Sequence, residues 1–270
     1  MEDRHMERDG VAIAYSDEGS GPFVGYAHGL FISRRLERWL RLADLSQVYE
    51  GRRYVEYDAR GHGLTGGRRE VEDYRWSNLA GDLVALLDEV GVDGPVDFMG
   101  TSMGTGTLLW AAVQEPRRFR RLVLMMPSTA WETRPAQAQF YRELADVAEA
   151  EGKAAVMTRF AEQAPAPILE ERFAELAENP TAPPAEMPDV PEELLPWVMR
   201  GAAVSDYPSA EEVAGLGQPA LILAEAGDPG HPESTARRLH ELLPNSELHV
   251  ARNLAAMRQW GARIDGFLRG

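Results

Sequence analysis

The sequence contains no cysteine, although it is 270 residues long. This absence excludes disulfides, thiolate nucleophiles and cysteine metal sites, but it leaves the redox compartment open. Positive charge is also scarce, because 28 lysines and arginines stand against 43 aspartates and glutamates and give a formal net charge of -15. Such an acidic surface repels nucleic-acid phosphates over most of its area, so we expect no nucleic-acid partner.

Long apolar runs are missing as well. No stretch reaches the roughly 18 consecutive apolar residues that cross a bilayer, so we expect no membrane span. Residues 1–9 (M-E-D-R-H-M-E-R-D) are dense with charge and lack the apolar centre of a secretory signal. A cytoplasmic protein that acts on a small molecule is therefore the expectation.

The most informative segment that is present is 98–106, F-M-G-T-S-M-G-T-G, which contains the pattern G-x-S-x-G around Ser102. The apolar segment 96–99 before it predicts a strand, and residues 105–114 after it predict a helix. A sharp turn between strand and helix would expose the Ser102 hydroxyl and aim the backbone N–H of Met103 at an oxyanion formed there. We therefore predict that Ser102 is a nucleophile.

The rest of the chain alternates strands and helices on both sides of one long interruption. Strands are predicted at 11–15, 23–27, 54–57, 120–126, 219–224 and 247–250, and helices at 76–91, 233–243 and the C-terminus. The strand signal disappears from 131 to 206, where prolines and acidic helical segments dominate. We predict one α/β core made of residues 1–130 and 207–270, with a mostly parallel sheet flanked by helices. Residues 131–206 are predicted to form a helical cap. Candidates for an apolar substrate lining are Trp131, Phe140, Tyr141, Phe160, Phe173, Trp197, Met199 and Tyr207.

Four segments, in order, resemble the α/β-hydrolase superfamily. They are 27–31 (A-H-G-L-F), 58–63 (D-A-R-G-H-G), the elbow at Ser102 and 226–232 (A-G-D-P-G-H-P). The resemblance implies an α/β-hydrolase fold in which the N–H groups of Leu30 and Met103 form an oxyanion hole. His28 lies beside that pocket and is a candidate for binding the substrate. It also implies that Asp228 is the acid of a catalytic triad.

The sequence departs from that family where the catalytic base should stand. By register, the usual late histidine falls near Ala256, and no histidine follows His249. His231 is the strongest substitute because it follows Asp228 closely, although a triad normally draws its acid and base from two loops. The alternative is that His231 caps the 233–243 helix or bonds to local backbone.

These patterns favour a cofactor-free serine hydrolase that cleaves a small ester, lactone or thioester through an acyl-enzyme. We found no metal constellation or phosphate-binding loop, so we expect neither metal nor cofactor.

The missing histidine leaves two alternatives, which are non-hydrolytic chemistry such as a lyase or cyclase step and noncatalytic ligand binding. Replacement of a catalytic histidine by alanine would leave the same sequence, although the missing glycine turn around Ala256 speaks against a single replacement. The sequence leaves open the substrate and the oligomeric state, including a homodimer.

Overall fold

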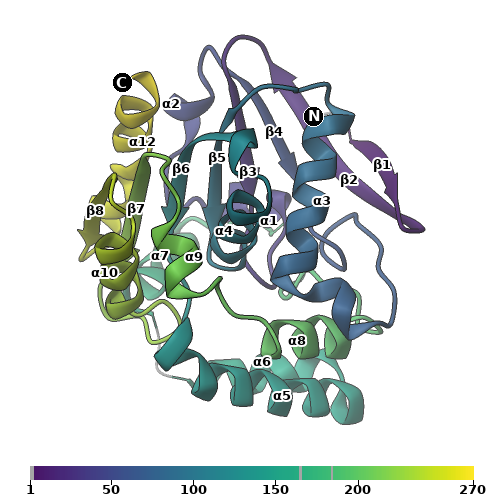
Figure 1. The fold of residues 1–270 in the computed structure, drawn as a ribbon. Coiled ribbons are helices and arrows are strands. Elements are labelled where there is room, and N and C mark those ends of the chain that lie inside the picture. Colours follow the sequence, from purple (N-terminus) through teal and green to yellow (C-terminus); the bar gives the residue numbers. More distant parts are fainter. Residues whose placement is uncertain (1–2, 164–165, 184) are drawn as a thin grey trace.

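A computed structural model describes residues 3–163, 166–183 and 185–270 (Figure 1). Its centre is an eight-stranded sheet with the strand order β1-β2-β4-β3-β5-β6-β7-β8. The strands are β1 Arg4–Arg8, β2 Val11–Gly19, β3 Phe23–Ala27, β4 Arg53–Tyr57, β5 Val96–Thr101, β6 Phe119–Met125, β7 Ala220–Glu225 and β8 Ser246–Ala251. Strand β2 pairs antiparallel with β1 and β4, and every other pairing is parallel. The prediction of a mostly parallel α/β-hydrolase sheet is thereby confirmed.

Helices cover both faces of this sheet. One face packs against α3 (Trp76–Glu89), α4 (Met103–Gln114) and α10 (Glu233–Leu242), and the other against α2 (Ser46–Tyr49) and α12 (Trp260–Arg269). Successive side chains of a strand point to opposite faces, so Phe98 belongs to the first apolar cluster and Met99 to the second. Covering on both faces explains why β5 is buried along its whole length.

The segment between β6 and β7 is helical. It contains α5 (Arg134–Glu151), α6 (Lys153–Ala161), α7 (Pro167–Glu178) and α8 (Leu195–Ala203), which we call the cap helices. Helices α5 and α8 pack on each other around an apolar cluster that includes Leu144, Val156 and Leu195 (Figure 1). A short helix, α9 (Ala210–Ala214), leads back to β7. The cap boundaries at 131 and 206 stay a prediction.

The cap is tied to loops that follow β3 and β4. The Asp189 N–H donates to the Phe31 carbonyl at 2.8 Å, the Gly63 N–H donates to the Asp189 carbonyl at 2.9 Å, and the Ser33 hydroxyl donates to the Asp189 carboxylate at 2.6 Å. In parallel sheets such loops lie at the carboxyl ends of the strands, which is where α/β folds bind ligands. The cap therefore lies over the edge of the sheet that carries Ser102.

Two local expectations were wrong. The charged N-terminal residues, for which no strand was predicted, form the edge strand β1, in which His5 pairs with Ala14 and only Met6 is buried. Charged residues are common on edge strands because they discourage further pairing. Helix α4 begins at Met103 rather than 105, since tertiary packing overrides the low helix propensity of Gly104. Among the described residues, no helix has both the length and the apolarity needed to cross a membrane.

Candidate active site

Ser102 is the single residue between β5 and α4, and its backbone is strained. Its φ of 54° and ψ of -109° lie outside the regions that a non-glycine residue prefers. A Cβ on Gly100 would lie 2.3 Å from the Gly104 carbonyl oxygen, and a Cβ on Gly104 would lie 2.1 Å from the Ala27 carbonyl oxygen. Both glycines are therefore required by the close crossing of α4 over β3 and β5.

Ser102, His231 and Asp228 form a continuous hydrogen-bonded chain. His231 Nε2 lies 2.8 Å from Ser102 Oγ, and His231 Nδ1 lies 2.7 Å from Asp228 Oδ2. A carboxylate only accepts hydrogen bonds, so Nδ1 carries the proton and Nε2 is left to accept the one from the Ser102 hydroxyl. This is the geometry that general-base activation of a serine requires.

The loop between β7 and α10 delivers both the acid and the imidazole. The Gly230 N–H donates to Asp228 Oδ1 at 2.7 Å, and the His231 N–H donates to the Asp228 carbonyl at 3.3 Å. The Thr129 N–H donates to the Gly230 carbonyl at 3.2 Å, which ties the loop to the segment after β6. Helix α10 has Pro232 at its N-cap and no side-chain cap. His231 therefore folds back onto Asp228 instead of capping the helix.

The contact with His231 keeps Asp228 ionised although the carboxylate is buried. Burial alone would raise the pKa of Asp228, but the hydrogen bond and charge of His231 outweigh it and lower this pKa well below its ordinary value. The side chains of His231 and Asp228 are 21% and 10% exposed. The pair is thus largely shielded from water.

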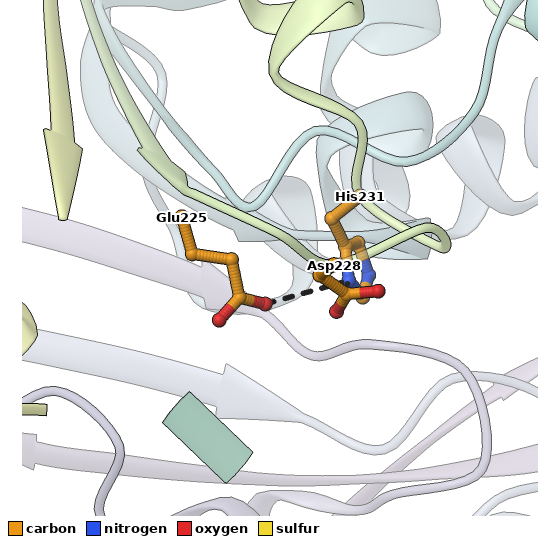
Figure 2. A group of neighbouring side chains, drawn as sticks. All are labelled: Glu225, Asp228 and His231. Carbon is orange, nitrogen blue, oxygen red and sulfur yellow. Dashed lines mark hydrogen bonds and ion pairs between the residues drawn. The ribbon is translucent and has the colours of Figure 1, made fainter. Parts of the chain in front are cut away.

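A second acid, Glu225, lies in the same cluster, and sequence reasoning missed it. Glu225 is the last residue of β7, and its Oε1 lies 3.8 Å from His231 Nδ1 (Figure 2). Burial, together with the neighbouring Asp228, raises the pKa of Glu225 to about 9. The available signal was an acid that ends an otherwise apolar strand, A-L-I-L-A-E, next to the G-D-P turn.

The two segments expected to carry the oxyanion donors lie beside Ser102. A Cβ placed on Gly29 would lie 3.5 Å from the Ser102 Cβ, so the loop that carries Leu30 passes directly beside the serine. Met103 is the first residue of α4, where backbone N–H groups have no partner within the helix. His28 is different, because its Nδ1 bonds to the Gly29 carbonyl at 2.7 Å and its Nε2 accepts from the Ala59 N–H at 2.9 Å. These contacts leave no ring nitrogen of His28 for a substrate, contrary to our expectation.

The remaining histidines have other partners. His62 Nδ1 bonds to the Arg60 carbonyl at 2.9 Å, and burial together with the neighbouring His28 lowers the pKa of His62 to about 3. His240 bonds to the Ser246 hydroxyl at 2.8 Å on the surface. His249 lies in β8, with its Nε2 3.7 Å from the Glu247 carboxylate.

The position where the family histidine was expected belongs to a helix. Ala256 lies in α11 (Leu254–Arg258), and its N–H donates to the Asn253 side chain at 2.9 Å. Ala256 packs against the apolar cluster around α12. The chain after β8 thus turns into a capped helix on one face of the sheet.

Aromatic side chains of the cap gather beside the oxyanion loop. Phe31, which follows Leu30, contacts Phe160 edge to face with 5.1 Å between ring centroids and Tyr141 at 6.3 Å. Phe140 joins the group at 5.6 Å from Phe160. The other candidate lining residues lie elsewhere: Trp131 and Tyr207 pack with the sheet, Trp197 and Met199 lie in the cap cluster, and Phe173 is exposed.

Among the described residues, Glu225, Asp228 and His231 form a group that could hold a metal ion. Each offers one ligand atom, and these three atoms lie within 4.8 Å of one another. The hydrogen bond between Asp228 and His231 Nδ1 already uses the ring nitrogen that faces the two acids. A metal ion would have to displace that proton, so the cluster is better described as a hydrogen-bonded group.

The fold and this arrangement define the chain as an α/β hydrolase, and comparison with known proteins agrees. A model of the alpha/beta hydrolase fold family matches residues 26–258, so the chain belongs to that family and is a hydrolase. A 3-oxoadipate enol-lactonase 2 of Acinetobacter baylyi is 27% identical over 248 residues, which is 89% of this chain and 85% of that protein.

Two further similarities are more limited. An epoxide hydrolase 2 of Siraitia grosvenorii is 31% identical over 126 residues, which is 46% of this chain and 38% of that protein. The structure of a thermophilic esterase from Thermogutta terrifontis superimposes with a TM-score of 0.80 at 20% identity, over 100% of this chain and 97% of the other.

Proposed function

We propose that this hydrolase cleaves a small carboxylic ester or lactone through an acyl-enzyme on Ser102. The proposal is carried by the hydrogen-bonded chain from Ser102 through His231 to Asp228. The enol-lactonase relative and the esterase-like fold favour an acyl substrate. Thioesters remain within the same chemistry, because they present the same carbonyl to the serine.

In the first half of the reaction, Ser102 Oγ attacks the substrate carbonyl carbon while His231 Nε2 takes the hydroxyl proton. The negative oxygen of the tetrahedral intermediate accepts hydrogen bonds from the N–H groups of Leu30 and Met103. Asp228 holds the imidazole in its Nδ1–H tautomer and stabilises the imidazolium. Collapse breaks the bond to the leaving alcohol, which takes the proton from His231.

In the second half, water attacks the acyl-enzyme and gives its proton to His231. The second tetrahedral intermediate then releases the carboxylic acid, and Ser102 recovers its proton. His28 has a supporting role, because its bonds to Gly29 and Ala59 fix the loop that presents Leu30. The cluster of Phe31, Tyr141 and Phe160 would contact the apolar part of the substrate.

A fluorophosphonate probe tests this proposal, because it labels only an activated serine. We expect rapid labelling that Ser102→Ala abolishes and His231→Ala slows strongly. His240→Ala is the matched control, since His240 is exposed and bonds to Ser246, and it should label like the parent. The same variants should rank identically in hydrolysis of p-nitrophenyl acetate, with and without a metal chelator. Absence of labelling at every pH from about 6 to 9 would favour non-hydrolytic chemistry or ligand binding, because an activated serine needs a working general base.

Epoxide hydrolysis is a second candidate because of the partial match to an epoxide hydrolase. An epoxide has no carbonyl, so attack by Ser102 on it would give a stable ether and not an acyl-enzyme that water can cleave. Styrene oxide therefore serves as the comparison substrate. Turnover of styrene oxide without turnover of p-nitrophenyl acetate would favour epoxide hydrolysis over ester hydrolysis.

A further inference from the structure

Glu225 has no part in the proton transfers proposed above, yet its carboxyl group lies beside two of the residues involved in them. The residue ends β7, its exposed fraction is 1%, and Figure 2 shows its side chain directed toward Asp228 and His231. Acids are rarely buried unless something pairs with them. The position of Glu225 therefore calls for a physical explanation.

The contacts of Glu225 fit a neutral acid and not a carboxylate. Its Oε1 is buried, and an ionised carboxyl group there finds no hydrogen-bond donor. Among residues 3–163, 166–183 and 185–270, no lysine or arginine forms an ion pair with it. The ionised Asp228 has a carboxylate oxygen within 4.8 Å of the Glu225 carboxyl group, and two like charges in one buried site are costly. A proton on Glu225 removes this cost and turns the unpartnered oxygen into a donor.

We propose that Glu225 is a positioning residue that acts as a neutral carboxylic acid, donating a hydrogen bond to the Asp228 carboxylate and thereby holding Asp228 against His231. The proton stays on Glu225 throughout the reaction. This inference rests on the proposed role of Ser102, Asp228 and His231. It extends that role by a third donor to Asp228, in addition to Gly230 and His231.

The electrostatics of the pair agree with this assignment. Burial and the neighbouring Asp228 raise the pKa of Glu225 to about 9, while the pKa of Asp228 is lowered. From outside their loop, Tyr141 of α5 interacts with Asp228: the pKa of Tyr141 is raised by burial and also by the charge of Asp228, while Arg134 opposes this rise.

The acid and the base come from the same loop, which explains why a hydrogen bond from Glu225 to Asp228 is useful. When acid and base come from two loops, two separate segments fix their relative position. Here Asp228 and His231 share one loop, so the loop can move without changing their mutual geometry. Glu225 is the last residue of β7, a strand that is paired on both sides. Its hydrogen bond to Asp228 therefore connects the loop to the rigid sheet.

Three variants test this role. Glu225→Gln keeps the shape and an N–H donor, and we expect kcat near neutral pH within about twofold of the parent. Glu225→Leu removes the donor, and we expect kcat to fall about 10- to 100-fold, the usual effect of losing a supporting hydrogen bond, with KM nearly unchanged. Glu247→Gln, an exposed acid on β8, is the control and should match the parent. Circular dichroism and Tm would establish that each variant is folded.

Two further measurements separate positioning from packing. The parent should lose kcat/KM as the pH rises through about 9, where Glu225 ionises and repels Asp228, and Glu225→Gln should lack this loss. Infrared difference spectroscopy should detect the carbonyl band of a buried protonated acid at neutral pH, absent from Glu225→Gln. The second measurement does not require activity.

The outcomes distinguish the two proposals. Two results would overturn only the role of Glu225. The first is labelling of Ser102 with unchanged kcat in folded Glu225→Leu. The second is an equal fall of kcat in Glu225→Gln and Glu225→Leu. No labelling of Ser102, with the infrared band still present, would overturn the proposed function and leave a protonated Glu225. Absence of the band at neutral pH would refute the neutral acid whatever the activity.

Discussion

His231 and Asp228 lie three residues apart on one loop, and a 2.7 Å hydrogen bond joins His231 Nδ1 to the Asp228 carboxylate. The same imidazole reaches Ser102 across 129 residues of chain. Acid and base therefore form one local unit, and only its contact with Ser102 depends on long-range folding. A change in this loop should alter the base and its orientation together.

The first prediction concerns the orientation of the imidazole. Asp228→Asn replaces an acceptor by an amide that can donate to His231 Nδ1, which favours the wrong tautomer. We expect kcat for p-nitrophenyl acetate to fall by about 10³- to 10⁴-fold, with little change in Tm. Since the pKa of Asp228 is lowered, Asp228 of the parent should stay ionised over the acid limb of the pH profile. A variant with parental kcat would show that Asp228 does not orient the base.

Much of this site could be predicted from the sequence, because glycines and turns leave local signals. The elbow, the oxyanion loop and Asp228 each follow a predicted strand, and parallel strands bring their ends together. The contact between His231 and Ser102 could not be derived, because it depends on how one short loop folds back. Glu225 was missed for another reason: a single acid at a strand end has no periodic signal, and its importance appears only when Asp228 stands beside it.

The second prediction concerns the absent late histidine. Adding Ala256→His to His231→Ala should not restore labelling of Ser102 or hydrolysis. Position 256 lies inside α11 and packs toward the cluster around α12, whereas proton transfer needs hydrogen-bond reach. The single variant Ala256→His should retain parental activity. Recovery of activity in the double variant would mean that α11 can open toward the site.

The third prediction concerns the crossing beneath Ser102. Gly104→Ala would place a methyl group 2.1 Å from the Ala27 carbonyl oxygen and 2.9 Å from that of His28. Backbone atoms cannot move aside cheaply, so we expect the free energy of unfolding to fall by about 3 kcal/mol or more. Urea denaturation would measure the change. Gly94→Ala has open space around the new methyl group and should alter the free energy of unfolding by less than about 0.5 kcal/mol.

The fourth prediction uses the raised pKa of Glu225 as a pH-dependent contribution to stability. The unfolded chain loses this proton near the ordinary value of 4.5, whereas the folded protein holds it up to about 9. Between these values the unfolded state binds fewer protons, so the free energy of unfolding falls as the pH rises. Glu225→Gln does not titrate and should gain Tm relative to the parent from pH 5 to pH 9. A difference in Tm that is independent of pH would contradict the raised pKa.

The last prediction concerns the aromatic cluster that links the cap to the oxyanion loop. Phe160 stacks edge to face on Phe31 at 5.1 Å, so Phe160→Ala should remove apolar surface from the substrate side of the site. We expect kcat/KM for p-nitrophenyl hexanoate to fall about 10-fold, the effect of a few lost apolar contacts. Acetate turnover and Ser102 labelling should change little, because the triad is untouched. Phe173→Ala is the control, since Phe173 is 41% exposed on α7, and it should leave both esters unaffected. Equal losses for both esters in Phe160→Ala would mean that the cluster supports the oxyanion loop and does not select the acyl chain.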